Sequence, residues 1–274
     1  MTEYAAPLVS IITPVHNGAD FIEGLIMSVR DQDYPNLEHI IIDDGSADNG
    51  ATAGILGHYP HLCWWARPNR GQYPTMNEGL KAAKGELVCF ISADDLMADG
   101  AVRTSVEYLR MHPGLDGAYG GYAFIDSQGR PIFPFRPLRN APARLYPYSL
   151  HIAHSSIYLR RGVLLEKGLF FDETLHYVGD YDWIVRLLRA PLRIGRISQD
   201  LSAIRLHEHQ TTNMSFPAMR DEIIKTQKRL GVSTFWASLF RKIMFGARLL
   251  NVARESGLRK ALRALADRIS PDVS

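Results

Sequence analysis

The sequence predicts an α/β fold in which helices cover a parallel sheet. Up to about residue 125, short apolar runs alternate with segments of helical periodicity. Most of these runs are continuously apolar, as in strands that are buried on both faces. The chain has 274 residues, of which 46% are hydrophobic and 22% charged, so it has the composition of an ordinary globular protein.

Strands and helices are expected to alternate along this first part. The predicted strands are residues 8–13, 37–43, 63–66 and 87–91. Helical spacing and stop signals predict helices at residues 20–32, 74–85 and 101–112. This order places the strands side by side and the helices on the faces of the sheet.

The pattern changes after about residue 117. Residues 117–135 are expected to form two strands joined by a turn at 127–129. A strand and a short helix are expected within 155–170, and a helix begins near Gly179. Acidic residues near the first turn of this last helix favour its N-terminus there.

Charge and cysteine content exclude several classes of protein. The formal net charge of +2 indicates no nucleic-acid partner. Two cysteines, Cys63 and Cys89, do not make a disulfide framework. We expect neither a signal peptide nor a membrane-spanning helix, and therefore a cytoplasmic location.

Polar clusters follow three of the predicted strands: TPVHN at 13–17, DDGS at 43–46 and SADD at 92–95. Ligands of such sheets bind beyond the carboxyl ends of the strands. Neither G-x-G-x-x-G nor a P-loop is present. Asp94 and Asp95 are like charges, which suits a divalent cation bound together with substrate phosphates. An ordinary acidic turn is the alternative.

The combined motifs resemble the nucleotide-sugar domain of the inverting family 2 glycosyltransferases. The similarity runs through VSIITPVHNGADF, IIIDDGSADNG, NRGQYPTMNEGLKAAKGELVCFISADD, GDYDWIVRL and IRLHEHQTT, over about residues 7 to 215. It implies the GT-A fold, with a Rossmann-like mixed central sheet flanked by helices. It also implies a nucleotide-sugar-binding half at 1–125, an acceptor-binding and catalytic half at 126–216, and a C-terminal helical extension at 217–274.

The resemblance assigns the donor-binding residues. It implies that Pro14, His16 and Asn17 contact the nucleotide base. Asp44 would accept a hydrogen bond from a base, most plausibly uracil, and Asp43 would lie near the ribose or be structural. The resemblance places Arg70 against phosphate, with Arg67 as its competitor.

The metal site follows from the same resemblance. Asp95 would coordinate Mn²⁺ or Mg²⁺, and Asp94 would hold the ribose or the sugar. His207 would complete the metal or diphosphate site, with His209 as the alternative.

An inverting transfer also needs a base that takes the proton of the acceptor hydroxyl. In the family this base is the Asp of a Glu-Asp pair, which Asp180 matches, while Gly179 stands in place of the Glu. Asp182 is the rival base, and Asp182 and Trp183 are expected to contact the acceptor or the sugar. A helix cap is the structural alternative for Asp180.

These roles predict a metal-dependent inverting glycosyltransferase. It would move a sugar from a nucleotide sugar to a hydroxyl of a glycan or lipid-linked saccharide. A UDP-sugar is the donor that the resemblance favours. A non-catalytic nucleotide-sugar-binding subunit of a glycan-assembly complex is the alternative. A nucleotidyltransferase would carry a Gly-rich, basic phosphate loop, which TPVHNGAD is not.

The C-terminal segment admits two interpretations. Four apolar residues recur there at helical spacing, with basic residues beside them: Leu258, Leu262, Leu265 and Ile269. Such helices either pack on the catalytic domain or make peripheral contact with the anionic inner membrane, where a lipid-linked acceptor would be found.

Overall fold

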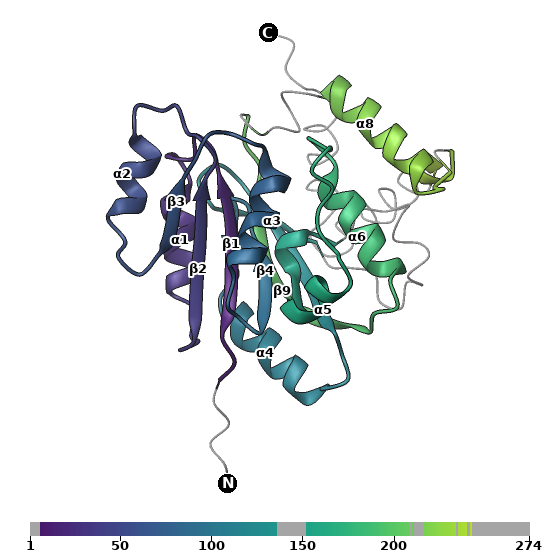
Figure 1. Ribbon diagram of the computed structural model, residues 1–274, viewed down its shortest axis with the longest axis horizontal. Coiled ribbons are helices and arrows are strands. Elements are labelled where there is room, and N and C mark those ends of the chain that lie inside the picture. The colour runs from purple at the N-terminus through teal and green to yellow at the C-terminus, as the bar shows by residue number, and fades with distance from the viewer. Residues whose placement is uncertain are drawn as a thin grey trace.

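One sheet runs through the centre of the molecule, with helices on both of its faces (Figure 1). The computed structural model describes residues 6–135, 152–208, 210, 216–233, 235–239 and 242. Within these residues the sheet has nine strands in the order β3-β2-β1-β4-β8-β6-β9-β5, and β7 pairs with β6 outside this path.

The strands come from both halves of the chain. Their bounds are β1 Val9–Val15, β2 Leu37–Asp43, β3 Cys63–Ala66, β4 Leu87–Phe90, β5 Leu96–Met97, β6 Gly117–Ile125, β7 Pro131–Phe135, β8 Ile157–Arg160 and β9 Ile194–Arg205. The first four are parallel, whereas β8 is antiparallel to both β4 and β6. The mixed sheet implied by the resemblance is therefore confirmed, and the purely parallel arrangement holds for the first half alone.

The helices are α1 Ile22–Arg30, α2 Ala51–Gly57, α3 Gln72–Ala82, α4 Ala101–Met111, the 3-10 turn η2 His154–Ser156, α5 Arg161–Glu166, α6 Gly179–Arg189 and α8 Phe216–Arg229. Apolar residues of α1, α2 and α4 form the core on one face of the sheet. Those of α3, α5 and α6 form the core on the other face. Successive residues of β1 serve the two cores in turn, with Ile11 in the first and Ile12 in the second, as strand geometry requires.

Besides the 3-10 turn η2, three elements were not predicted from the sequence. Strand β9 mixes buried and exposed residues without regular alternation, and it pairs with β6 through shifts in register. Helix α2 has seven residues, two of them glycine, and strand β5 has two residues. Elements this short carry too little periodicity to be recognised.

The predicted C-terminal extension begins with helix α8, which packs against α6. Helix α8 packs its Met219 and Ile223 against Tyr181 and Val185 of α6. Residues 243–274, which include the amphipathic repeat from Leu258 to Ile269, lie outside the described residues. Among the helices that are described, none has the length and apolar character needed to span a membrane.

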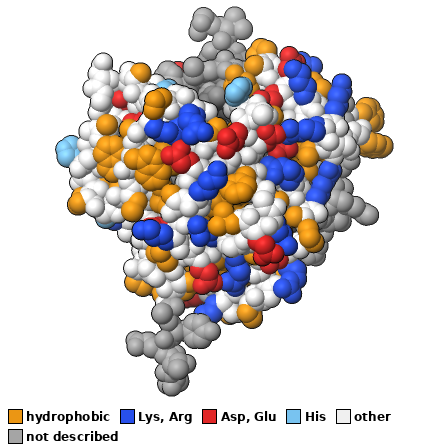
Figure 2. Space-filling view, in the orientation of Figure 1, with side chains coloured by type: hydrophobic (Ala, Val, Ile, Leu, Met, Phe, Trp, Pro, Cys, Tyr) orange, Lys and Arg blue, Asp and Glu red, His pale blue; other side chains and the backbone are white. Residues whose placement is uncertain are grey.

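The surface carries mixed charge on the face that Figure 2 shows, where Lys and Arg side chains are interspersed with Asp and Glu. This agrees with the nearly balanced composition of 31 basic and 29 acidic residues. A long field of one sign, of the kind that attracts nucleic acid, is absent from this face.

We predict that His39 makes the protein less stable below neutral pH. The imidazole lies fully buried in β2, 3.0 Å from the Thr13 hydroxyl, and burial lowers its pKa from 6.5 to about 3. Below pH 6.5 His39 therefore binds a proton in the unfolded chain but stays neutral in the folded protein. This group alone lowers the free energy of unfolding by about 1.4 kcal/mol per pH unit.

Denaturant unfolding at pH 7 and pH 5 measures this loss. The His39→Gln variant should show a smaller difference between the two pH values than the wild type. An unchanged difference would assign the pH dependence to other groups.

Candidate active site

The three predicted polar clusters meet at the carboxyl edge of β1, β2 and β4. Val15 of β1 is paired with Asp43 of β2, and the Asp44 amide donates to the Val15 carbonyl at 2.8 Å. The loop after β1 also reaches the segment after β4, since a Cβ atom on Gly18 would lie 3.7 Å from that of Ala93. The topology thus brings TPVHN, DDGS and SADD together, as the sequence predicts.

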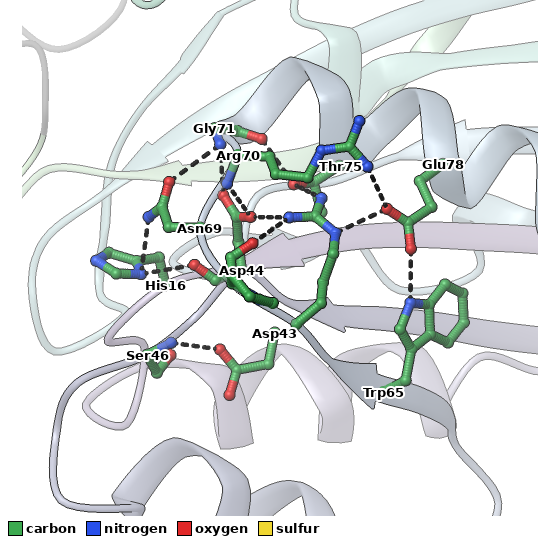
Figure 3. Close-up of polar contacts among 12 residues, drawn as sticks. His16, Asp43, Asp44, Ser46, Trp65, Asn69, Arg70, Gly71, Thr75 and Glu78 are labelled. Atoms are coloured by element: carbon green, nitrogen blue, oxygen red, sulfur yellow. Dashed lines mark hydrogen bonds and ion pairs between the residues drawn. The ribbon is translucent and has the colours of Figure 1, made fainter.

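Two of the predicted base-binding residues lie at the surface of this edge. His16 and Asn17 are exposed, and His16 Nδ1 lies 3.0 Å from the Asp44 carbonyl oxygen and 3.2 Å from Asn69 Nδ2 (Figure 3). Pro14 is instead buried within β1, so its side chain does not lie at the surface of this edge. Asn69, which the sequence analysis did not single out, belongs with His16.

Asp44 organises the loop that follows β3. Its carboxylate, 4% exposed, is paired with the Arg67 guanidinium and accepts the backbone N–H groups of Arg70 and Gly71, both at 2.8 Å (Figure 3). Both carboxylate oxygens therefore have partners within the protein. Asp44 shapes the floor of this region rather than presenting an unpaired acceptor.

The two arginines of this loop differ in availability. Arg67 is 13% exposed and also donates to Glu78 at 2.7 Å and to the Thr75 hydroxyl at 2.8 Å. Arg70 is 59% exposed, with Glu78 3.8 Å away. Arg67 is thus a buried structural cation, and Arg70 is the one that can turn toward a phosphate.

Asp43 fits the structural alternative. Its side chain is buried, and its Oδ1 accepts the Ser46 backbone N–H at 2.8 Å (Figure 3). This contact closes the turn of DDGS in the manner expected of an Asp at a turn.

The adjacent carboxylates Asp94 and Asp95 have different environments. Asp95 is buried, and its Oδ1 accepts the Arg205 backbone N–H at 3.1 Å. Burial and the neighbouring Asp94 carboxylate raise the pKa of Asp95 well above its usual range. Asp94 is 30% exposed and lies 3.0 Å from Nε2 of His207. The geometry therefore favours Asp94, and not Asp95, as the carboxylate available to a ligand.

His207 and Arg205 arrive together at the end of β9. Arg205 donates to the Asp94 carbonyl oxygen at 2.8 Å, and its guanidinium lies over the Phe21 ring. The His207 ring packs against the same phenylalanine, with 4.5 Å between ring centroids. The motif IRLHEHQ predicted His207 as a site residue but did not point to Arg205. His209, the alternative to His207, lies outside the described residues.

The described residues contain no group of three His, Cys, Asp or Glu side chains that could hold a metal ion alone. Mg²⁺ is commonly bound by one or two carboxylates together with substrate phosphates, and Mn²⁺ accepts the same oxygen ligands. Asp94 and His207 fit as the protein's part of such a site, which a diphosphate would complete.

Asp180 is the second residue of α6 and is 39% exposed. Its Oδ1 accepts the Tyr181 backbone N–H at 2.8 Å, so the carboxylate is oriented at the start of the helix. A Cβ atom on Gly179 would lie 2.6 Å from the Tyr73 ring. Tyr73 therefore fills the space beside this backbone, and a glutamate cannot take the place of Gly179 without displacing the ring.

The neighbouring candidates are structural. Trp183 is fully buried in the core and donates its indole N–H to the Leu169 carbonyl at 2.9 Å. Asp182 is 1% exposed and pairs with Arg186 and Arg229. The expectation that Asp182 and Trp183 contact an acceptor is wrong, because the helical turn directs both side chains into the protein.

Sequence reasoning missed His154, in the 3-10 turn η2. Its Nδ1 lies 3.9 Å from Oδ2 of Asp180, and its Nε2 lies 3.3 Å from the Ser92 hydroxyl. Burial lowers the pKa of His154, and the carboxylates of Asp180 and Asp94 oppose that shift. No motif marks this histidine, and the turn that carries it is too short to be predicted.

Helix α8 fixes the segment that precedes Asp180. The Glu222 carboxylate accepts the backbone N–H groups of His176, Tyr177 and Val178 at 2.9, 2.6 and 3.0 Å. The loop that leads into α6 is therefore held by the C-terminal helix. No motif in the sequence predicts this contact.

A mixed sheet with an acidic carboxyl edge and an oriented carboxylate on a following helix is the arrangement that the sequence motifs led us to expect of a GT-A type glycosyltransferase. The sequence model of Glycosyl transferase family 2 matches residues 10–168. An uncharacterized glycosyltransferase from Rickettsia typhi is 31% identical over 222 residues, which cover 79% of this chain and 69% of the relative. The chain therefore belongs to glycosyltransferase family 2 and is a glycosyltransferase.

Another relative is similar over a smaller share of both chains. TuaG from Bacillus subtilis, named as a teichuronic acid biosynthesis glycosyltransferase, is 33% identical over 134 residues, or 47% of this chain and 52% of TuaG.

Two solved structures share the fold. TarS from S. aureus in complex with UDP-GlcNAc has a TM-score of 0.61 at 22% identity, covering 74% of this chain and 60% of TarS. The mannosyltransferase PcManGT from Pyrobaculum calidifontis, in complex with GDP-Man and Mn²⁺, has a TM-score of 0.56 at 19% identity, covering 99% and 77%.

We predict that Arg67→Met lowers the free energy of unfolding by roughly 3–5 kcal/mol, because it leaves the buried Asp44 carboxylate without its cation. Arg70→Met is the matched control, and its exposed ion pair contributes at most about 1 kcal/mol. Urea unfolding of both variants checks the difference. Equal losses would contradict a structural role specific to Arg67.

Proposed function

We propose that this glycosyltransferase is metal-dependent and inverting, and that it transfers a sugar from a UDP-sugar to a hydroxyl of a glycan or lipid-linked saccharide. The observation that carries the proposal is the placement of the Asp94–His207 pair and the Asp180 carboxylate on different elements that face one site. Asp94 and His207 lie at the end of the sheet, and Asp180 lies on α6 with His154 between them.

The donor side rests on the edge formed by β1 and β2. His16, Asn17 and Asn69 present ring and amide groups that can bind a nucleotide base, and the exposed Arg70 can approach a diphosphate. TarS and PcManGT, which share the fold, were solved with UDP-GlcNAc and GDP-Man. These complexes support a nucleotide-sugar donor for this chain.

The cation would be held by Asp94 and His207. We propose Asp94 in place of Asp95 as the carboxylate ligand, because the Asp95 carboxylate is buried against β9. A bound Mn²⁺ or Mg²⁺ would stabilise the charge of the departing nucleoside diphosphate. The Mn²⁺ in the PcManGT complex supports a divalent cation here.

Asp180 would act as the general base. It takes the proton of the acceptor hydroxyl while that oxygen forms the new bond to the anomeric carbon and the bond to the diphosphate breaks. Attack from the side opposite the leaving group inverts the anomeric configuration. Exposure of Asp180 and its fixed orientation at the start of α6 support this role.

The acceptor is proposed to be a growing cell-surface polysaccharide or its lipid-linked precursor. TuaG, named for teichuronic acid biosynthesis, supports a polysaccharide acceptor. Peripheral contact with the inner membrane would suit a lipid-linked acceptor, and the exposure of Phe235 and Trp236 beyond α8, at 68% and 59%, supports it. The rival non-catalytic subunit would have no use for an oriented, exposed Asp180.

We predict that Asp94→Ala lowers the affinity for UDP in Mn²⁺ to the value measured in EDTA, because the cation loses its exposed carboxylate ligand. Asp95→Asn should retain the affinity, since an amide oxygen can still accept the Arg205 N–H. Calorimetry with UDP, with and without Mn²⁺, measures both. If Asp95→Asn abolished the metal effect and Asp94→Ala kept it, the earlier assignment to Asp95 would stand.

We predict that Asp180→Asn retains UDP binding but lowers kcat roughly 10²–10⁴-fold, because the amide cannot take up the acceptor proton. Transfer is assayed with the donor that a thermal-shift screen of UDP-, GDP- and TDP-sugars selects. Asp33→Asn removes the same charge at an 85% exposed side chain and serves as the control. A fully active Asp180→Asn enzyme would place the base elsewhere.

A further inference from the structure

His154 lies between the two parts of the candidate site. Its imidazole separates the Ser92 hydroxyl, at the end of β4, from the Asp180 carboxylate on α6. With its side chain 12% exposed, it is nearly enclosed, whereas Asp180 is 39% exposed. The two nitrogens of one ring thus face the segment after β4, which carries Asp94, and the helix that carries Asp180.

The turn that carries His154 is held rigidly. The Ser155 hydroxyl lies 3.0 Å from that of Ser202, and the Ser156 hydroxyl donates to the Gly121 carbonyl at 3.0 Å. Both serines are buried, and their partners belong to β9 and β6. The position of the imidazole is therefore set by the central sheet and not by α6.

The two nitrogens of the ring face groups of different chemistry. Nε2 faces a hydroxyl that can donate, and Nδ1 faces a carboxylate that only accepts when ionised. A ring protonated on Nδ1 can accept from the Ser92 hydroxyl and presents an N–H on the side of the carboxylate. Nδ1 lies 3.9 Å from Oδ2 of Asp180, while Oδ1 accepts the Tyr181 N–H.

We propose that His154 is a positioning residue for Asp180, which fixes the direction of the carboxylate relative to the Asp94 end of β4. This inference rests on the proposed base role of Asp180. Orienting partners of this kind matter because a carboxylate held by one backbone N–H alone can still rotate its second oxygen away from the acceptor.

The test compares the wild type with His154→Ala, His154→Asn and His154→Gln. Asn carries its amide near the position of Nδ1, and Gln carries its amide near Nε2. His154→Ala should lower kcat roughly 10- to 100-fold, as is typical of orienting partners, with KM for the donor unchanged. His154→Asn should recover more of kcat than His154→Gln. His58→Ala, at an exposed histidine after α2, is the matched control.

Unchanged kcat in His154→Ala overturns the inference. Equal losses in all three variants, with a parallel fall in melting temperature, also overturn it, because they would show a packing role. If the wild type transfers no sugar, the proposed function fails and the inference is decided by a crystal structure of His154→Ala. A displaced Asp180 carboxylate then supports it, and an unmoved one refutes it.

Discussion

The site depends on how the fold separates two adjacent carboxylates at the end of a buried strand. Asp94 and Asp95 would repel each other if both faced the same cavity. Strand β9 gives the two carboxylates different partners, because the Arg205 backbone N–H donates to Asp95 inside the protein while His207 lies beside Asp94, which is 30% exposed. One carboxylate becomes part of the framework, and the other is left for a ligand. Strand β9 therefore determines which of the two carboxylates after β4 is available to a ligand.

The same principle places Asp180, the proposed base. Asp180 depends on segments distant in sequence: Tyr73 packs on the backbone of Gly179, Glu222 holds the preceding loop, and His154 faces the carboxylate. Helix α8 is therefore a support of the site as well as the start of the C-terminal extension. Such supports explain why catalytic geometry is sensitive to residues that touch no substrate.

The sequence predicted the strands of the first half and the meeting of three polar clusters, because buried parallel strands have a strong apolar signal and their carboxyl ends share an edge. It could not tell which of Asp94 and Asp95 faces outward, since that is decided by pairing with β9, 110 residues away along the chain. For Trp183 the sequence predicted a surface role for a residue that the structure buries. An aromatic residue beside a candidate base suggested acceptor contact, but helical geometry sends it into the core. His154 could not be found, because its importance lies in contacts with Ser92 and Asp180 that no local pattern records.

The central claim is that Asp94 and His207, and not Asp95, provide the protein's ligands to the cation that accompanies the donor. Anomalous diffraction from crystals grown with UDP and Mn²⁺ tests it most directly. We expect a manganese peak at bonding distance from Asp94 and Nε2 of His207, with the diphosphate completing the site and Asp95 still bound to the Arg205 N–H. A peak bonded to Asp95, with Asp94 turned away, would contradict the account.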